Sequence, residues 1–150
     1  MTRFLSVLVI LIGVVAVIMG AVFIGLGASR DMQLKSAMRL EHVTLGIESE
    51  LGDEVIDSLP EALKAGDTIR EHRHGIAPTY GDLLGEGRYD PTNPQHLTYA
   101  QAMNLENYLY LAGVAFGLTQ VVMGSGVFMV ITGIALGSAG ILLYRLRKAH

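Results

Sequence analysis

Two long segments without charged side chains dominate this sequence, one near each end. Residues 4–29 and residues 107–144 contain no Asp, Glu, Lys, Arg or His, and all 14 acidic residues lie between positions 31 and 106. A hydrocarbon core about 30 Å thick is crossed by roughly 20 apolar helical residues. Each segment is therefore long enough to cross a bilayer, and we expect an all-α membrane protein.

The first segment has an alternative interpretation as a cleaved secretory signal, since it combines a basic start with small residues near Gly27 and Ala28. The apolar part of such a signal is usually about 7–15 residues long. The uncharged run here is much longer. We therefore expect residues 1–29 to form a first transmembrane helix that is retained.

The second segment is too long for a single span, and the flanking charges fix which part crosses. Positive charge beside a span stays on the cytoplasmic side, so Arg3 and the basic tail 145–150 share that side. Counting back about 22 residues from Arg145 puts the second transmembrane helix at 123–144.

This topology predicts a bacterial inner (plasma) membrane protein that crosses the membrane twice. Both termini are cytoplasmic, and the acidic region 30–106 is extracytoplasmic. The apolar residues 107–122 then project beyond the bilayer.

Glycine recurs every seven residues in both apolar segments. The predicted helix-packing residues are Gly13, Gly20, Gly27, Gly126, Gly133 and Gly140. A seven-residue repeat keeps one helix face, and small residues there let two backbones approach closely. We expect an antiparallel hairpin pairing Gly13 with Gly140, Gly20 with Gly133, and Gly27 with Gly126. The alternative is that these glycines are unrelated, because glycine is common in membrane spans.

The middle of the chain predicts a small, mostly helical cap. The apolar stripe of Leu40, Val43, Ile47 and Leu51 predicts a helical stalk over 30–51. Ser58 and Glu61 form a capping box that starts a helix at 59–73, with Gly75 as its stop.

The rest of the cap is a predicted loop followed by a long helix. Glycines and prolines predict a loop over 75–97. Thr98 and Gln101 form a second capping box, so we expect a helix over 98–147 that contains the second span. The helix at 59–73 has a shallow apolar face formed by Ala62, Ala65, Gly66 and Ile69.

Residues 108–122 are apolar on every side rather than along one stripe. A helix that is apolar all round must be buried all round, and one facing helix with a small cap cannot cover it. Either the bilayer lies differently or another chain covers the rest, and we favour another chain. The predicted partner-binding residues are Tyr108, Leu111, Phe116 and Leu118.

His72 and His74 are the candidates for metal chemistry. Two imidazoles, with acidic or histidine neighbours such as Glu71, could bind zinc or copper. Alternate residues share a face in an extended segment but not on a helix. We favour the simpler interpretation that polar side chains near a helix C-terminus interact with its last carbonyl groups.

Several function classes are disfavoured. The chain has no Cys, which excludes disulfides and a cysteine nucleophile. The apolar segments lack the ionisable groups that ion and proton paths usually need, and they lack a His to hold haem. We therefore expect no cofactor. The net charge of −3 gives no reason to expect a nucleic-acid partner.

The arrangement of the chain, with Ile69-Arg-Glu-His72 followed by Thr79 and Tyr80, resembles uncharacterised small bacterial membrane proteins. These have one transmembrane helix near each end and an extracytoplasmic middle region, and the resemblance implies no particular activity. We predict a non-enzymatic membrane subunit or scaffold, surrounded by membrane lipid, that assembles with another membrane protein or as a homo-oligomer. The alternative is an anchored extracytoplasmic domain that binds metal or is catalytic.

Overall fold

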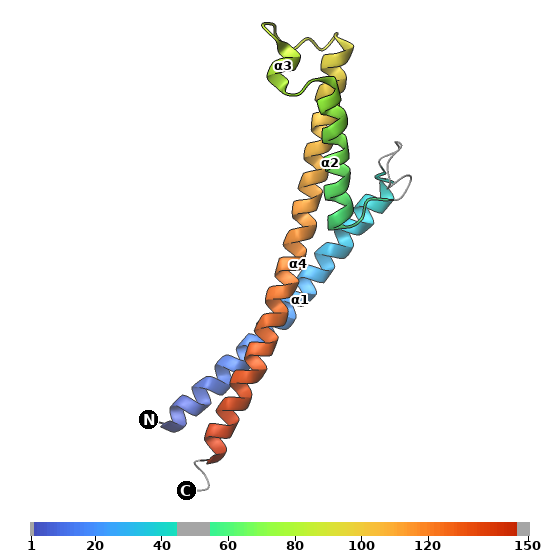
Figure 1. Ribbon diagram of the computed structural model, residues 1–150. Helices are drawn as coiled ribbons and strands as arrows, with labels where there is room; N and C mark the ends of the chain where they lie inside the picture. Colours follow the sequence, from blue (N-terminus) through green and yellow to red (C-terminus); the bar gives the residue numbers. More distant parts are fainter. Residues whose placement is uncertain (1, 45–54, 147–150) are drawn as a thin grey trace. The chain divides into compact units, whose positions relative to one another are not determined.

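The computed structural model describes residues 2–44 and 55–146, and every regular element within these two ranges is an α-helix. The helices, shown in Figure 1, are α1 (Thr2–Leu40), α2 (Leu59–Ile76), α3 (Tyr80–Leu84) and α4 (Pro94–Leu146). Both α1 and α4 are long and apolar enough to cross a membrane, judged by length and composition. The all-α prediction is confirmed for the described residues.

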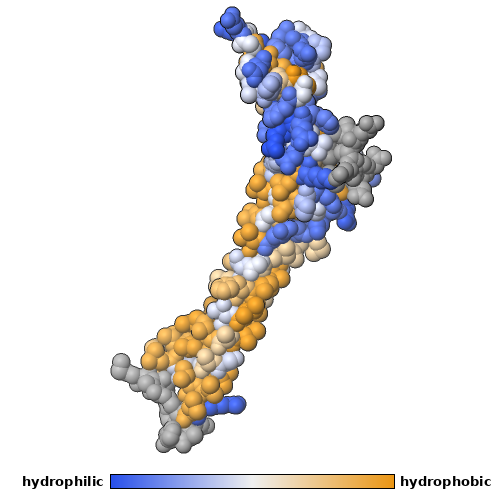
Figure 2. All heavy atoms as spheres, in the orientation of Figure 1, coloured by the Kyte–Doolittle hydropathy of each residue, from blue (hydrophilic) through white to orange (hydrophobic). Residues whose placement is uncertain are grey.

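The chain divides into two compact units. Unit 1 combines Met1–Met32 with Leu118–His150, and unit 2 is Gln33–Gly117. The two long helices contribute residues to both units, whereas α2 and α3 belong to unit 2 alone. On the face drawn in Figure 2, hydrophobic residues cover unit 1, and hydrophilic residues dominate around α2 and α3.

Unit 2 is held together by the packing of α2 against α4 (Figure 1). Its buried hydrophobic cluster comprises Ile56, Ala62, Ala65, Ile69, Leu109 and Phe116. The predicted shallow face of α2 is confirmed, because Ala62, Ala65, Gly66 and Ile69 are its buried residues. Small side chains on α2 thus let the larger Leu109 and Phe116 of α4 fill the space between the helices.

The start of α2 follows the predicted capping box. Ser58 accepts a hydrogen bond from the backbone N–H of Glu61, and the Glu61 carboxylate accepts one from the N–H of Asp57 at 3.0 Å. The predicted stop at Gly75 is wrong, because α2 runs to Ile76 and is capped by the extended residue Ala77. Pro78 explains this end, since the residue before a proline is driven out of the helical conformation.

The first helix ends earlier than its apolar stripe suggested. The prediction of a helix over 30–51 is wrong at residues 41–44, because a Schellman turn stops α1 after Leu40. His42 takes a left-handed conformation with φ of 47°, and Val43 donates its backbone N–H to the Met38 carbonyl oxygen at 3.0 Å. The predicted stripe residues Ile47 and Leu51 lie outside the described residues.

The predicted loop over 75–97 contains α3 and the first turn of α4. Thr79 caps α3 by accepting a hydrogen bond from the N–H of Asp82 at 3.1 Å. The prediction that the last helix starts at Thr98 is wrong, because α4 begins at Pro94 and the side chain of Asn93 accepts from the N–H of Gln95 at 2.9 Å. Asparagine is a strong N-cap and proline suits the first helical position, so this pair starts the helix earlier.

Candidate functional site

The interface within unit 1 is a column of small residues on each helix. The buried residues of unit 1, among those whose exposure the structure describes, are Ser6, Gly13, Gly20 and Gly27 on α1 and Thr119, Gly126, Gly133 and Gly140 on α4. Each column repeats every seven residues. The large apolar side chains point outward instead; Phe4 is 73% exposed and Phe128 is 69% exposed.

The two columns meet in a register seven residues away from the predicted one. A Cβ atom added to Gly13 would lie 2.7 Å from the backbone oxygen of Gly133, and one added to Gly20 would lie 2.5 Å from that of Gly126. The predicted pairing of Gly13 with Gly140 is therefore wrong. Because both series repeat every seven residues, a shift of seven again sets glycine against glycine.

Ser6 and Thr119 are the members of the columns that sequence reasoning missed. A Cβ atom on Gly140 would lie 3.2 Å from the backbone oxygen of Ser6, and one on Gly27 would lie 3.1 Å from that of Thr119. These small polar residues continue the seven-residue repeats beyond the glycines. Recognising them as repeat members would have given four contacts in the observed register against three in the predicted one.

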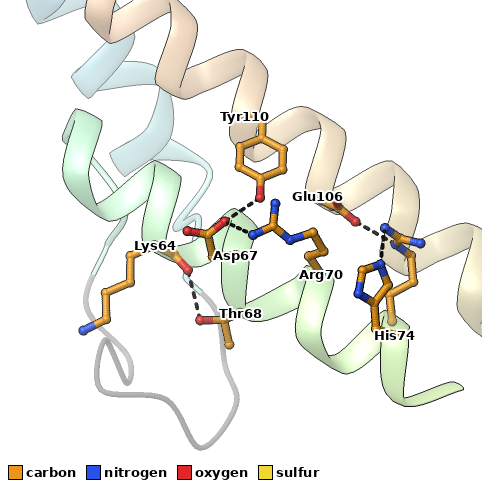
Figure 3. Close-up of polar contacts among 8 residues, drawn as sticks. Lys64, Asp67, Thr68, Arg70, His74, Glu106 and Tyr110 are labelled. Atoms are coloured by element: carbon orange, nitrogen blue, oxygen red, sulfur yellow. Dashed lines mark hydrogen bonds and ion pairs between the residues drawn. The ribbon is translucent and has the colours of Figure 1, made fainter. Parts of the chain in front are cut away.

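Unit 2 contains a buried polar cluster between α2 and α4 (Figure 3). The Arg73 guanidinium donates from Nε to the Glu106 carboxylate at 2.7 Å, and the two side chains are only 12% and 9% exposed. Arg73 also donates to the hydroxyl of Tyr99, a fully buried side chain. The bond to Glu106 raises the pKa of Arg73 above its ordinary value, although burial opposes the rise. The positive charge is thus fixed at this position.

A second polar contact, one helical turn after Glu106 along α4, joins the same two helices. The Tyr110 hydroxyl donates to the Asp67 carboxylate at 2.6 Å, and Arg70 donates to the same oxygen at 2.8 Å (Figure 3). Burial, and then the bond to Asp67, raise the pKa of Tyr110 to about 12. Tyr110 also lies over Gly66, where a Cβ atom would be 3.0 Å from its ring. Both polar contacts therefore align α2 on α4.

The predicted partner-binding residues differ in their exposure to solvent. Tyr108 is 70% exposed and Leu111 is 63% exposed, but Phe116 is 1% exposed in the core of unit 2. The inclusion of Phe116 is therefore a wrong prediction, because Phe116 fills the space beside α2. Leu118 belongs to unit 1, where it is 63% exposed.

The part of α4 within unit 2 keeps one exposed apolar face. This outer face of α4 consists of Tyr108, Leu111 and Val114, which are 70%, 63% and 66% exposed. The opposite side carries the buried Glu106, Leu109 and Phe116. The helix is thus half covered by its own chain, and the predicted surplus of apolar surface is narrower than the sequence suggested.

His72 and His74 are both exposed on α2. Residues two apart point roughly 200° away from each other around a helix. The Arg73 guanidinium also lies 3.3 Å from Nε2 of His74. Within residues 2–44 and 55–146, no group of three or more His, Cys, Asp or Glu side chains is arranged to hold a metal ion. The metal alternative stays a prediction that no described contact favours.

Comparison with known proteins adds no relative from which a function could be carried over. No family model matches the chain, and no curated protein or solved structure matches it.

Proposed function

We propose that this protein is a non-enzymatic integral membrane subunit or scaffold whose helices α1 and α4 cross the bilayer as an antiparallel hairpin. The observation that carries the proposal is the arrangement of unit 1, with small residues inside and large apolar residues outside. Without a hydrophobic force between helices in lipid, small residues permit the close backbone contact that holds a pair together. Large exposed apolar surfaces of this kind need lipid or protein to cover them.

The contacts of Gly27 support a second span longer than the sequence alone suggested. Because Gly27 meets Thr119 and Met123, residues 118–123 share the depth of the end of the first span. We therefore extend the proposed second span to about residues 118–144. The positive residues flanking the spans favour cytoplasmic termini and an extracytoplasmic unit 2 in a bacterial inner membrane.

The packing of the columns supports a retained first helix rather than a cleaved signal. Removing α1 would expose Gly126 and Gly133, whose backbones lie against Gly20 and Gly13. In the retained hairpin each helix thus covers the glycine column of the other. An N-terminal tag that stays on the full-length membrane protein is the expected result, and loss of the tag from the mature chain would contradict it.

The outer face of α4 supports the proposed assembly. Its three apolar side chains belong to unit 2 and lie N-terminal to the proposed second span, so another protein, or a second copy of this chain, is the proposed cover. Aromatic and aliphatic anchors such as Tyr108 and Leu111 are typical of protein interfaces.

Single cysteines provide the topology test, because the natural chain contains none. We expect a membrane-impermeant maleimide to label Glu86→Cys, an exposed position between α3 and α4, in spheroplasts of a bacterial host. A cysteine appended after residue 150 should react only after lysis. Equal labelling of both positions, or the reverse pattern, would contradict the proposed orientation.

The assembly test is size analysis of the full chain in mild detergent by light scattering. We expect a protein mass of at least twice 16.1 kDa, or a second membrane protein at fixed stoichiometry. Leu111→Glu should abolish this assembly, whereas Glu71→Lys, an exposed change on α2, should preserve it. A lone monomer in the unmodified protein would count against the proposal.

A further inference from the structure

A groove of about 350 Å³ lies between α1 and α4 within unit 1. Its lining residues are Leu26, Gly27, Arg30, Leu118, Thr119 and Val122. Gly27 and Thr119 are buried and form its base, while Leu26 and Leu118 are 55% and 63% exposed beside it. The volume falls within the range of about 300–1,000 Å³ that is typical of small-molecule sites.

Arg30 is the one charged residue among those that line this groove. It is the first charged residue after the uncharged run 4–29, and it is exposed. The neighbouring Asp31 is held by Thr119, whose hydroxyl donates to the carboxylate at 3.3 Å. A guanidinium has five N–H donors and binds a phosphate through two of them. Arg30 can therefore bind a phosphate while keeping contacts within the chain.

A second groove in unit 1 serves as an internal comparison. It has nearly the same volume, about 330 Å³, and its lining includes Gly13, Val17, Gly133, Gly137 and Ser138. No residue that lines it is charged. Such a groove can take hydrocarbon alone. The Arg30 groove has a guanidinium in addition, and this group can bind an anion.

We propose that the Arg30 groove binds one phospholipid, with an acyl chain along Leu26, Leu118 and Val122 and the phosphodiester on Arg30. The inference rests on the proposed crossing of the bilayer, because that crossing puts Leu26 and Val122 within the hydrocarbon and Arg30 at its edge. A phospholipid presents chain and phosphate in this same order. A packed protein helix would instead have to take the Arg30 guanidinium out of water, and removing a charge from water is costly.

The test uses the full-length protein in detergent, with bound lipid measured by native mass spectrometry. The probes are phosphatidylglycerol and phosphatidylethanolamine, which share the phosphodiester, together with diacylglycerol and glycerol phosphate. We expect both phospholipids to be retained and the other two probes to be lost. Arg30→Gln should reduce phospholipid occupancy about tenfold, since a charge-assisted bond of this kind contributes roughly one factor of ten or more.

Two matched pairs of variants separate the site from general effects of mutation. Val122→Trp should fill the groove and reduce retention, whereas Val121→Trp, at a 64% exposed position that does not line it, should not. Arg30→Lys keeps the charge and should retain most of the binding that Arg30→Gln loses. Unchanged helical circular dichroism checks that each variant is folded.

Several outcomes would overturn the inference. These are equal phospholipid retention by Arg30→Gln and the unmodified protein, equal retention of diacylglycerol, or binding of glycerol phosphate as tight as that of the lipids. The maleimide pattern of Arg30→Gln distinguishes this failure from failure of the proposed function. If the labelling pattern is that of a two-span protein and phospholipid retention does not depend on Arg30, only the proposed lipid site is wrong.

Discussion

The backbone oxygen of Gly126 lies 2.5 Å from the place where a Cβ atom on Gly20 would be. The relationship is reciprocal, because a Cβ atom on Gly126 would lie 2.7 Å from the oxygen of Gly20. At these distances the backbones themselves would have to move to admit a methyl group. The two helices of unit 1 are therefore in contact at a distance that only glycine permits.

Replacing Gly20 by leucine should separate the helices of unit 1. We expect Gly20→Leu to reduce the free energy of unfolding by about 1–3 kcal/mol, the usual cost of overpacking. Gly25→Leu is the matched control on the same helix, since a Cβ atom there meets nothing within 4 Å. Protease resistance and denaturation of the full chain in mild detergent measure the difference, and equal loss in both variants would contradict the observed contact.

The seven-residue repeats identified all six packing glycines from the sequence, but they did not determine the register. A periodic pattern matches itself after each shift of seven, so Gly13 can face Gly140 or Gly133. Glycines alone favour the first register, with three glycine pairs against two in the observed one. The difference lies at the ends of the columns, where Ser6 and Thr119 are also small. A search for small residues of any type, and not for glycine alone, would have extended each repeat by one residue.

The ion pair between Arg73 and Glu106 should contribute strongly to the stability of unit 2. Removing one partner of a buried pair leaves an uncompensated charge and typically costs about 3–5 kcal/mol. We expect Glu106→Leu to destabilise the unit by an amount in this range, measured by denaturation of the full-length protein. The combined variant Arg73→Met/Glu106→Leu should recover much of the loss, because it leaves no unpaired charge. A double variant that loses the sum of both single effects would show that the two residues act independently.

This pair could not have been found from sequence reasoning. The two residues are separated by 33 positions and lie on different helices, and many other acids and bases fill the same region. Helical patterning predicted the apolar face of α2 because its residues are close in sequence. The partner of Arg73 depends instead on how α2 lies along α4, which no local pattern contains.

Unit 2 should lose stability at high pH through Tyr110. Its folded-state pKa of about 12 lies above the ordinary value of 10.0. The neutral hydroxyl is therefore favoured by folding, and its contribution is complete below pH 10 and is lost as the pH rises towards 12. Tyrosinate absorbance should show a late-titrating group that Tyr110→Phe removes. Tyr108→Phe, at a 70% exposed position, should leave this group in place. If Tyr108→Phe removed the late-titrating group, Tyr110 would not be its source.

The start of α4 differs between the capping box in the sequence, at Thr98, and the cap in the structure, at Asn93. Substitutions at these two positions show which one starts the helix. Thr98 and Gln101 form a recognisable capping box, yet they lie inside α4, while Asn93 accepts the N–H of Gln95. Asn93→Ala should therefore cost about 1 kcal/mol, typical of a lost N-cap, and should speed hydrogen exchange in the first turn of α4. Thr98→Ala should cost much less, because alanine has a high helix propensity and the helix has already begun. If Thr98→Ala were the more damaging change, the helix would start where the capping box predicted.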